Sequence, residues 1–509
     1  MRRLCDWILP LAATVAAIAL LWGTTAPLGV PGEWEWSRHE QGHSLFLTFA
    51  PLAITAGCYL GYVWLGLRRL RACGNWECRA WVVGLALAGF AWLWQAQEAA
   101  PNGYQLSKAA WVLYFPGPSG YFTEARGDNR PVREFLATYE QRMSQGDVLH
   151  IGTHPPGLIL VFRGLLSLCR SSPTIVRLLI DSQPESVRSS FDELARTTTA
   201  IHELFTETDR AVLWLAALCA QAVAAMTVWP LFGLLRGERD RQASWLGAAF
   251  WPAVPAVAIF LPKSDAFFPC PATLILWLWI SGFQERSRLR VFLAGVTFWI
   301  GLMLSLAFLP IALIAAVHSA WTIWCESPEQ GRRKLLRNLL LDLLIAGSGF
   351  FLLCLLCWLT SGMNLPAVWW LNFRNHAGFY DQFTRSWWKW LLVNPMELAF
   401  AAGAPVVVLA ACGMFRQLRL WRRPSNAAAV AWLVVWGLLW LSGKNMGEAA
   451  RLWIFLIPGL LWIGVSDLAS ANLPDPSERV DFRRAGFLLV LQFVLCAATV
   501  TRVVGFHFS

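Results

Sequence analysis

Long apolar segments alternate with short polar connections along almost the whole chain. They are residues 7–29, 44–66, 79–97, 210–234, 242–261, 266–283, 289–304, 306–324, 337–359, 397–414, 427–442, 450–466 and 485–504. Most have about the twenty residues that an α-helix needs to cross the hydrocarbon core of a bilayer. The pattern therefore predicts an all-α fold, a polytopic transmembrane helix bundle of about thirteen spans.

The composition excludes a set of soluble domains. Hydrophobic residues make up 56% of the chain and charged residues only 15%, whereas soluble domains carry about 25% charged residues. The same abundance of apolar residues excludes intrinsic disorder. The net charge of +10 does not indicate a nucleic-acid partner, because the basic residues lie in short connections between apolar segments, where they orient the spans.

The basic connections predict which side of the membrane each loop faces. They lie at residues 68–71, 236–241, 286–290, 332–334 and 416–423. With a cytoplasmic N-terminus and an odd number of crossings, all of them fall on the inner side, as basic loops usually do. A shorter apolar block, 157–169, would reverse this arrangement if it crossed. We therefore predict that it is a partial or re-entrant element.

This orientation divides the chain into three parts. Residues 1–98 are predicted to form the N-terminal spans, residues 99–209 an exoplasmic loop with short surface helices and the re-entrant element, and residues 210–509 a C-terminal transmembrane bundle. The polar segments 262–265, 361–396 and 442–451 then face the same side as the long loop. We expect a protein of the plasma (inner) membrane with its active site on the exoplasmic or periplasmic side, since a channel carries its ionisable groups nearer mid-membrane.

The exoplasmic loop contains two carboxylates just before a predicted surface helix at 131–145. Glu124 and Asp128 are candidates for a general base that accepts a proton from an incoming hydroxyl or amine. For each of them, helix capping and solvation are the alternative.

A histidine follows in the same loop at a rigid position. His154 precedes Pro155 and Pro156, which exclude helix and stiffen the backbone, so it is expected to meet a phosphate at the membrane surface. Together with Asp147 and His150 it is also a candidate ligand of a divalent cation. The spacing matches no metal motif, so no cofactor is certain.

Charged residues in distant segments are predicted to reach the same face. They are Lys263, Asp265, Arg374, His376, Lys444, Glu448 and Arg451. Glu448 and Arg451 lie three residues apart and share one helix face. Charges at the start of a span are costly unless they are paired or used, and arginine and lysine commonly hold phosphate.

Together these features resemble the GT-C superfamily of integral membrane glycosyltransferases, which includes protein O-mannosyltransferases and the lipid A aminoarabinose transferase. Those families carry an Asp-Glu-Ala-Arg-like motif in the first outer loop and a His-Pro-Pro motif after it. Here Thr123-Glu124-Ala125-Arg126 precedes His154-Pro155-Pro156, and Pro262–Asp265 resembles a later tip of the same superfamily. Thr123 stands where the families have aspartate, which leaves Glu124 and Asp128 as candidate bases.

The resemblance implies transfer of a sugar from a polyprenyl-phosphate donor to a lipid, glycan or protein acceptor. Glu124 or Asp128 would deprotonate the acceptor, and His154 with Lys444, Arg451 or Arg374 would hold the departing phosphate. Lys263, Asp265, His376 and Glu448 would support them. The alternative is a transporter or flippase of a lipid-linked or small solute, which would carry inverted repeats; we see none in the sequence.

Overall fold

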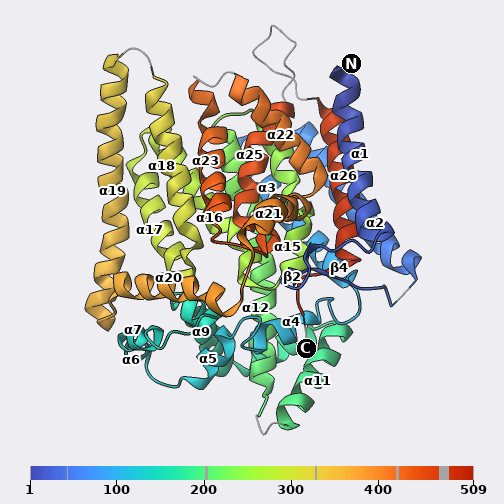
Figure 1. Cartoon of the computed structure of the whole chain (residues 1–509), viewed down its shortest axis with the longest axis vertical. Helices are drawn as coiled ribbons and strands as arrows, with labels where there is room; N and C mark the ends of the chain where they lie inside the picture. The colour runs from blue at the N-terminus through green and yellow to red at the C-terminus, as the bar shows by residue number, and fades with distance from the viewer. Residues whose placement is uncertain are drawn as a thin grey trace.

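The computed structural model describes residues 2–42, 44–200, 204–326, 329–419, 423–468 and 481–507, with all of their side chains except those of residues 2–5, 150 and 200. It is an almost wholly helical bundle (Figure 1). The start of α1 (Arg2–Gly23) and the facing ends of α18 (Leu309–Trp324) and α19 (Glu329–Ser361) lie at the top of Figure 1, and the chain ends in its lower half.

Eight stretches in the described ranges are long and apolar enough to cross a membrane, which is the pattern of a multi-pass membrane protein. They lie in α1 (Arg2–Gly23), α2 (Leu45–Arg69), α12 with α13 (Glu207–Met226, Val228–Arg236), η2 with α16 (Ser264–Ala266, Pro269–Glu285), η3 with α18 (Leu306–Phe308, Leu309–Trp324), α19, η4 with α23 (Pro424–Asn426, Ala427–Leu441) and α26 (Phe482–Val500). Each coincides with one of the apolar segments of the sequence.

The other five apolar segments are shorter, broken or less apolar. α3 (Asn75–Glu98) is one long helix, but its tryptophans and glutamines lower its hydropathy, and α17 (Arg288–Leu304) has only 17 residues. Residues 242–261 and 450–466 are divided among short helices, with proline near the breaks, because proline has no N–H for the helix ladder. These helices are α14 (Arg241–Ala249), η1 (Trp251–Ala253), α15 (Pro255–Phe260), α24 (Ala449–Leu452), η5 (Ile454–Leu456) and α25 (Ile457–Leu468).

The fifth segment, 397–414, lies across a sharp bend. α21 (Trp387–Ala402) and α22 (Ala404–Arg419) meet at 109°, with Gly403 between them at φ 92°. Helix length therefore supports eight crossings, or ten if each bent pair crosses once. The prediction of thirteen spans is not confirmed.

Block 157–169 also ends at a bend. α9 (Gly157–Ser171) has 15 residues and meets α10 (Pro173–Asp181) at 104°. Ser172 caps the new helix and Pro173 begins it. A helix this short followed by such a bend fits the expectation of an element that does not cross straight through.

The remaining helices of the predicted exoplasmic loop gather below the bundle (Figure 1). They are α4 (Lys108–Tyr114), α5 (Tyr121–Gly127), α6 (Val132–Ala137), α7 (Tyr139–Met143), α8 (His150–Thr153) and α11 (Glu185–Ala200). The single surface helix predicted at 131–145 is wrong, since α6 and α7 are separate. The break is at Thr138, whose hydroxyl bonds back to the Glu134 carbonyl at 3.0 Å. Phe135 and Tyr139 are buried in the protein.

Two short antiparallel strand pairs fix the position of the connection between α1 and α2. β1 (Gly29–Val30) pairs with β2 (Trp34–Glu35), and β3 (Ser37–Arg38) pairs with β4 (Val503–Val504) near the C-terminus. α20 (Leu365–Gln382) lies across the lower part of the bundle in Figure 1 and leads into α21.

A buried ion-pair group joins α22, α25 and α26 in the bundle. The Asp467 carboxylate lies 2.7 Å from Arg416 Nε and also contacts Arg484. Asp467 and Arg484 are both buried. The charges are therefore compensated within the protein, as buried ions must be.

Candidate functional site

Four charged side chains from distant segments meet at the start of α24. Arg451 Nη2 lies 3.0 Å from the Glu448 carboxylate, and Arg451 Nε lies 3.8 Å from Asp265 of η2. Lys263, two residues before Asp265, is only 3% exposed. Burial and the nearby Arg451 lower the pKa of Lys263 to about 7, although Asp265 and Glu448 act in the opposite direction. Lys263 and Arg451 thus lie beside the carboxylates of Asp265 and Glu448, at a position with little access to solvent.

The backbone before α24 is a tight loop with unusual torsion angles. Gly443, Gly447 and Glu448 all have positive φ. Glycine adopts such angles readily because it has no Cβ, but for Glu448 the conformation is strained. Such a conformation costs roughly 1–3 kcal/mol and persists only where surrounding contacts enforce it. The ion pair between Glu448 and Arg451 is one such contact.

An apolar cavity of about 130 Å³ adjoins this cluster. Its lining includes Leu20, Trp36, Ile259, Val393, Glu397 and Ala450. The Glu397 carboxyl group is the one ionisable side chain in that lining, and it accepts hydrogen bonds from Trp36 Nε1 at 3.0 Å and from the Ala450 N–H at 3.3 Å. Because Ala450 precedes Arg451, the apolar space ends beside the charged cluster.

Tyr121, the first residue of α5, connects the cluster with His154. Its ring meets the His154 ring edge to face, with centroids 5.8 Å apart. Burial raises the pKa of Tyr121, as does Asp265, whereas Arg451 lowers it. The tyrosine therefore stands within the electrostatic reach of both sides of the cluster.

The backbone at His154 is held by donors from two other helices. Asn372 Nδ2 donates to the His154 carbonyl at 3.2 Å and to the Gly152 carbonyl at 2.9 Å. Tyr139 donates its hydroxyl to the His154 carbonyl at 2.9 Å. Asn375 Nδ2 donates to the Gly152 carbonyl at 3.0 Å. These bonds fix the turn that precedes Pro155.

Lys444 belongs to the loop before α24 and lies close to His376 of α20. Lys444 Nζ sits 4.1 Å over the Phe373 ring. Burial and the Lys444 charge lower the pKa of His376, which favours a neutral imidazole. The Tyr380 hydroxyl donates to the Lys444 carbonyl at 2.7 Å and accepts from the Met446 N–H at 2.9 Å. α20 is thereby locked to the loop that carries Glu448.

Arg385 and Glu33 were not selected from the sequence, although both lie close to this region. The Arg385 guanidinium lies between the Trp34 and Trp390 rings, 5.5 and 5.7 Å from their centroids, and donates to the Glu33 carbonyl at 2.6 Å. Glu448 raises the pKa of Arg385, although burial lowers it more. The only sequence signal was a pair of acidic residues in a short tryptophan-rich connection.

The Glu33 carboxylate anchors the start of α21. It accepts hydrogen bonds from the Ser386 N–H and from Trp390 Nε1, both at 2.8 Å, and from Lys389 Nζ at 3.2 Å. Burial alone would raise the pKa of Glu33, but these bonds outweigh it and lower that pKa from 4.5 to about 2.

The two predicted catalytic carboxylates contact arginines of their own loop. Glu124 pairs with Arg142. Asp128 pairs with Arg130 at 2.6 Å, and the hydrogen bonds from Arg130 lower the pKa of Asp128. Glu124 and Asp128 both line an open pocket of about 440 Å³. Glu124 is one helical turn from Tyr121 on α5, so it is the closer of the two to the cluster along that helix.

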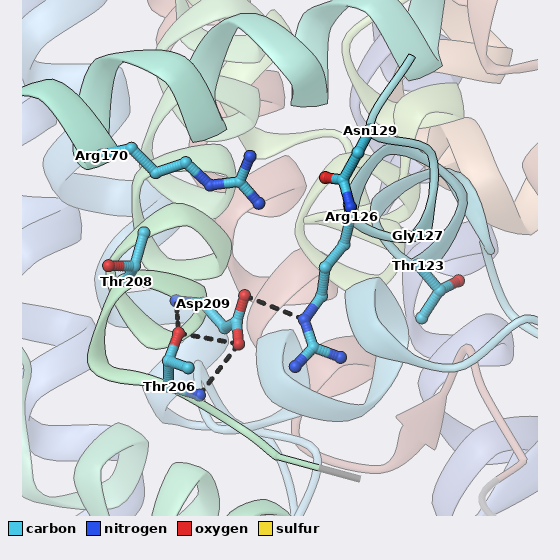
Figure 2. A pocket seen from close by; sticks show the side chains of 8 residues that line it. All are labelled: Thr123, Arg126, Gly127, Asn129, Arg170, Thr206, Thr208 and Asp209. Carbon is cyan, nitrogen blue, oxygen red and sulfur yellow. Dashed lines mark hydrogen bonds and ion pairs between the residues drawn. The ribbon is translucent and has the colours of Figure 1, made fainter.

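A second open pocket shares Gly127 and Asn129 with the first (Figure 2). It has a volume of about 620 Å³, and its lining is polar apart from Gly127: Thr123, Arg126, Asn129, Arg170, Thr206, Thr208 and Asp209. Arg126 Nε pairs with Asp209 at 3.1 Å, and Asp209 closes a capping box with Thr206 at the start of α12. These bonds connect α5 with the start of α12.

The structure therefore brings together only part of the predicted set. Lys263, Asp265, Glu448 and Arg451 form one cluster, with His154 beside it through Tyr121. Lys444 and His376 form a neighbouring pair. Arg374 is on the exposed side of α20, opposite the buried asparagines.

No group of three or more histidine, cysteine, aspartate and glutamate side chains that would hold a metal ion occurs among the described residues. Asp147, one predicted cation ligand, accepts hydrogen bonds from the Leu149 and Gly152 N–H groups. The side chain of His150, the other, lies outside the described part of the structure.

Comparison with known proteins adds no family. No protein-family model, no curated protein and no solved structure matches this chain.

Proposed function

We propose that this protein is a glycosyltransferase that moves a sugar from a polyprenyl-phosphate donor to an acceptor at the exoplasmic end of the bundle. The proposal depends on one observation: the cluster of Lys263, Asp265, Glu448 and Arg451 lies next to Ala450, which lines an apolar cavity. An isoprenoid phosphate needs that combination, since its chain is apolar and its phosphate is charged. The resemblance to GT-C enzymes supports the same assignment.

Arg451 and Lys263 would hold the donor phosphate. The guanidinium presents several N–H groups to phosphate oxygens, and a charge-assisted bond is stronger in a buried site than in water. His154 and Lys444 are further candidates. As the phosphate departs, its negative charge grows, so the same cations stabilise the transition state more than the ground state.

The reaction would be a direct displacement. The acceptor oxygen or nitrogen forms a bond to the anomeric carbon while the bond from that carbon to the phosphate oxygen breaks. The bonding electrons leave with the phosphate, and the acceptor proton passes to a carboxylate.

Glu124 and Asp128 remain proposed bases, and Asp265 and Glu448 join them. A bound phosphate would compete with both of these carboxylates for Arg451. The displaced carboxylate would then be free to accept the proton. Asp128 is held by Arg130, which lowers its pKa and so makes it a poorer base.

The test is transfer by the purified protein. Radiolabelled polyprenyl-phosphate sugars are incubated with the protein and membrane extract, and the labelled product is identified. We expect Arg451→Gln to lose about 10²–10³-fold in rate, the usual effect of removing one electrostatic donor. Arg290→Gln is the matched control, since Arg290 pairs with Glu285 in an exposed connection.

Two results would overturn the proposal. One is wild-type protein that yields no labelled product from any donor. The other is wild-type protein that moves labelled lipid across a vesicle bilayer without transferring the sugar, which would establish the transporter alternative instead.

A further inference from the structure

A second apolar groove opens between α1, α2 and α26, and no residue of the charged cluster lines it. Its volume is about 570 Å³, and it carries no charged side chain. Its lining includes Ile18, Trp22, Phe49, Gly57, Trp92 and Phe493. The three helices are candidate membrane spans, so the groove extends along the part of the bundle that lipid chains surround.

Cationic side chains stand at one end of this groove. The Arg502 guanidinium lies 5.5 Å from the centroid of the Trp22 ring, which lines the groove. Pairing of β3 with β4 sets Arg38 opposite Val503, the neighbour of Arg502. His39 and His507 are close by, because their charges act on each other.

The hydrogen bonds of these arginines go to backbone carbonyls. Arg38 Nη2 donates to the Ala26 carbonyl at 2.6 Å, and Arg502 Nη1 donates to the His39 carbonyl at 3.2 Å. Carbonyl oxygens orient a guanidinium but do not neutralise it. The two positive charges are therefore held in place without being cancelled.

No carboxylate forms an ion pair with Arg38 or Arg502 in the described ranges, and the Nε atom of each is buried without a hydrogen-bond partner there. The pKa shifts are those of positive charges without a nearby anion. Burial and the Arg502 charge lower the pKa of Arg38. Burial and the charges of His507 and Arg502 lower the pKa of His39. An anion at this position would relieve the repulsion. The cluster at Arg451 differs, because its two cations are matched by two carboxylates.

We propose that this groove and its cationic end bind one anionic phospholipid, with an acyl chain along the groove and the headgroup phosphate between Arg38 and Arg502. Arginine suits this role because its planar fork matches phosphate oxygens. The groove alone fits any lipid chain, and the unpaired charges select the anionic headgroup. The argument for this site does not rest on the proposed sugar transfer.

The direct test compares two lipids with the same chains. Purified protein in neutral detergent is titrated with phosphatidylglycerol and with phosphatidylcholine, and bound lipid is counted by native mass spectrometry. We expect phosphatidylglycerol to bind at least tenfold more tightly. The double variant Arg38→Gln, Arg502→Gln should lose about that tenfold for phosphatidylglycerol only. Equal binding of the two lipids by wild-type protein would overturn the proposal.

A second pair of variants tests the groove without touching the arginines. Gly57 lines the groove, and a side chain added there meets nothing within 4 Å. Gly57→Leu should fill the space and weaken binding of both lipids. Gly61, one turn later on α2, has equal room but does not line the groove, so Gly61→Leu is the matched control. This comparison decides the matter if the arginine variant does not fold.

Inorganic phosphate separates a lipid site from an ion site. It offers the anion without the chains, so millimolar phosphate should leave phosphatidylglycerol binding almost unchanged. Complete competition by phosphate, together with no effect of Gly57→Leu, would show a simple anion site and reject the lipid assignment.

Discussion

Arg451 lies between two carboxylates, 3.0 Å from Glu448 on its own turn and 3.8 Å from Asp265 on the distant η2 segment. One guanidinium thereby joins the loop before α24 to the tip before α16. Its side chain is only 11% exposed, so little water competes for its N–H groups. An arriving phosphate would have to exchange places with a carboxylate, which couples binding to the release of a base.

The fork shape of Arg451 should matter as much as its charge. Arg451→Lys keeps the charge but replaces the planar fork by a single ammonium group, which does not reach two partners in the same way. We expect at least a tenfold fall in kcat/KM for sugar transfer. Arg333→Lys, in an exposed helix pair with Glu329, should leave transfer unchanged. Equal rates for wild type and Arg451→Lys would argue against phosphate binding by the guanidinium.

Donor affinity should depend on pH through Lys263. Its pKa is about 7 in the folded protein, so the ammonium form is present below pH 7 and is lost as the pH rises. A bound phosphate favours the charged form. Donor binding should therefore weaken between pH 6 and 8.5, with proton uptake at the upper end, as isothermal titration in several buffers would show.

The variant Lys263→Gln serves as the comparison for that pH profile. It has no proton to lose, so it should bind the donor weakly but with a flat profile over the same range. A wild-type profile as flat as that of the variant would exclude Lys263 from the phosphate site.

Asn372 should position His154. Asn372→Ala removes hydrogen bonds to the Gly152 and His154 carbonyls, whereas Asn375→Ala removes bonds to the Met143 and Gly152 carbonyls and none to His154. Each loss should cost about 1–3 kcal/mol of stability. Only Asn372→Ala should also raise the KM for the donor. If both variants change KM alike, the effect is one of folding alone.

Glu33 should stabilise the fold above its unfolded pKa. Its pKa is lowered from 4.5 to about 2, so its contribution is complete above pH 4.5 and disappears as the pH falls toward 2. Glu33→Gln should lower the melting temperature at pH 7 and reduce the loss seen between pH 4.5 and 2. Thermal unfolding followed at several pH values measures both effects. An unchanged melting temperature at pH 7 would contradict the anchoring role.

The buried ion pairs of Asp467 should be far more important than exposed ones. Asp467→Asn leaves the buried Arg484 with only the more distant carboxylate of Asp6, at 3.6 Å, and breaking a buried pair typically costs about 3–5 kcal/mol. Glu329→Gln, in an exposed pair with Arg333, should cost less than about 1 kcal/mol. Similar melting temperatures for the two variants would show that the buried pair adds no stability.

Part of the candidate site was accessible from residue types and order. Charged residues at the start of an apolar span are rare and costly, and that rule selected Glu448 and Arg451, whereas Lys263 and Asp265 were selected as an outer tip and by the resemblance. The rule does not say which charges neutralise one another. Glu124 and Asp128 were selected as loop carboxylates able to act as a general base, yet they pair with Arg142 and Arg130 in their own loop. Glu397, a lone carboxylate at the start of an apolar segment, satisfied the rule and was overlooked.

The sequence by itself determined the all-α class, the positions of the long apolar helices and the polar segments between them. Those features follow from the length and hydropathy of continuous stretches of sequence, because a helix in lipid forms all of its backbone hydrogen bonds within itself. Only the tertiary structure decided where helices break, as at Gly403 and Thr138, and which side chains meet, as Arg451 meets Asp265. Such contacts depend on packing between segments far apart in the chain, which no local pattern encodes.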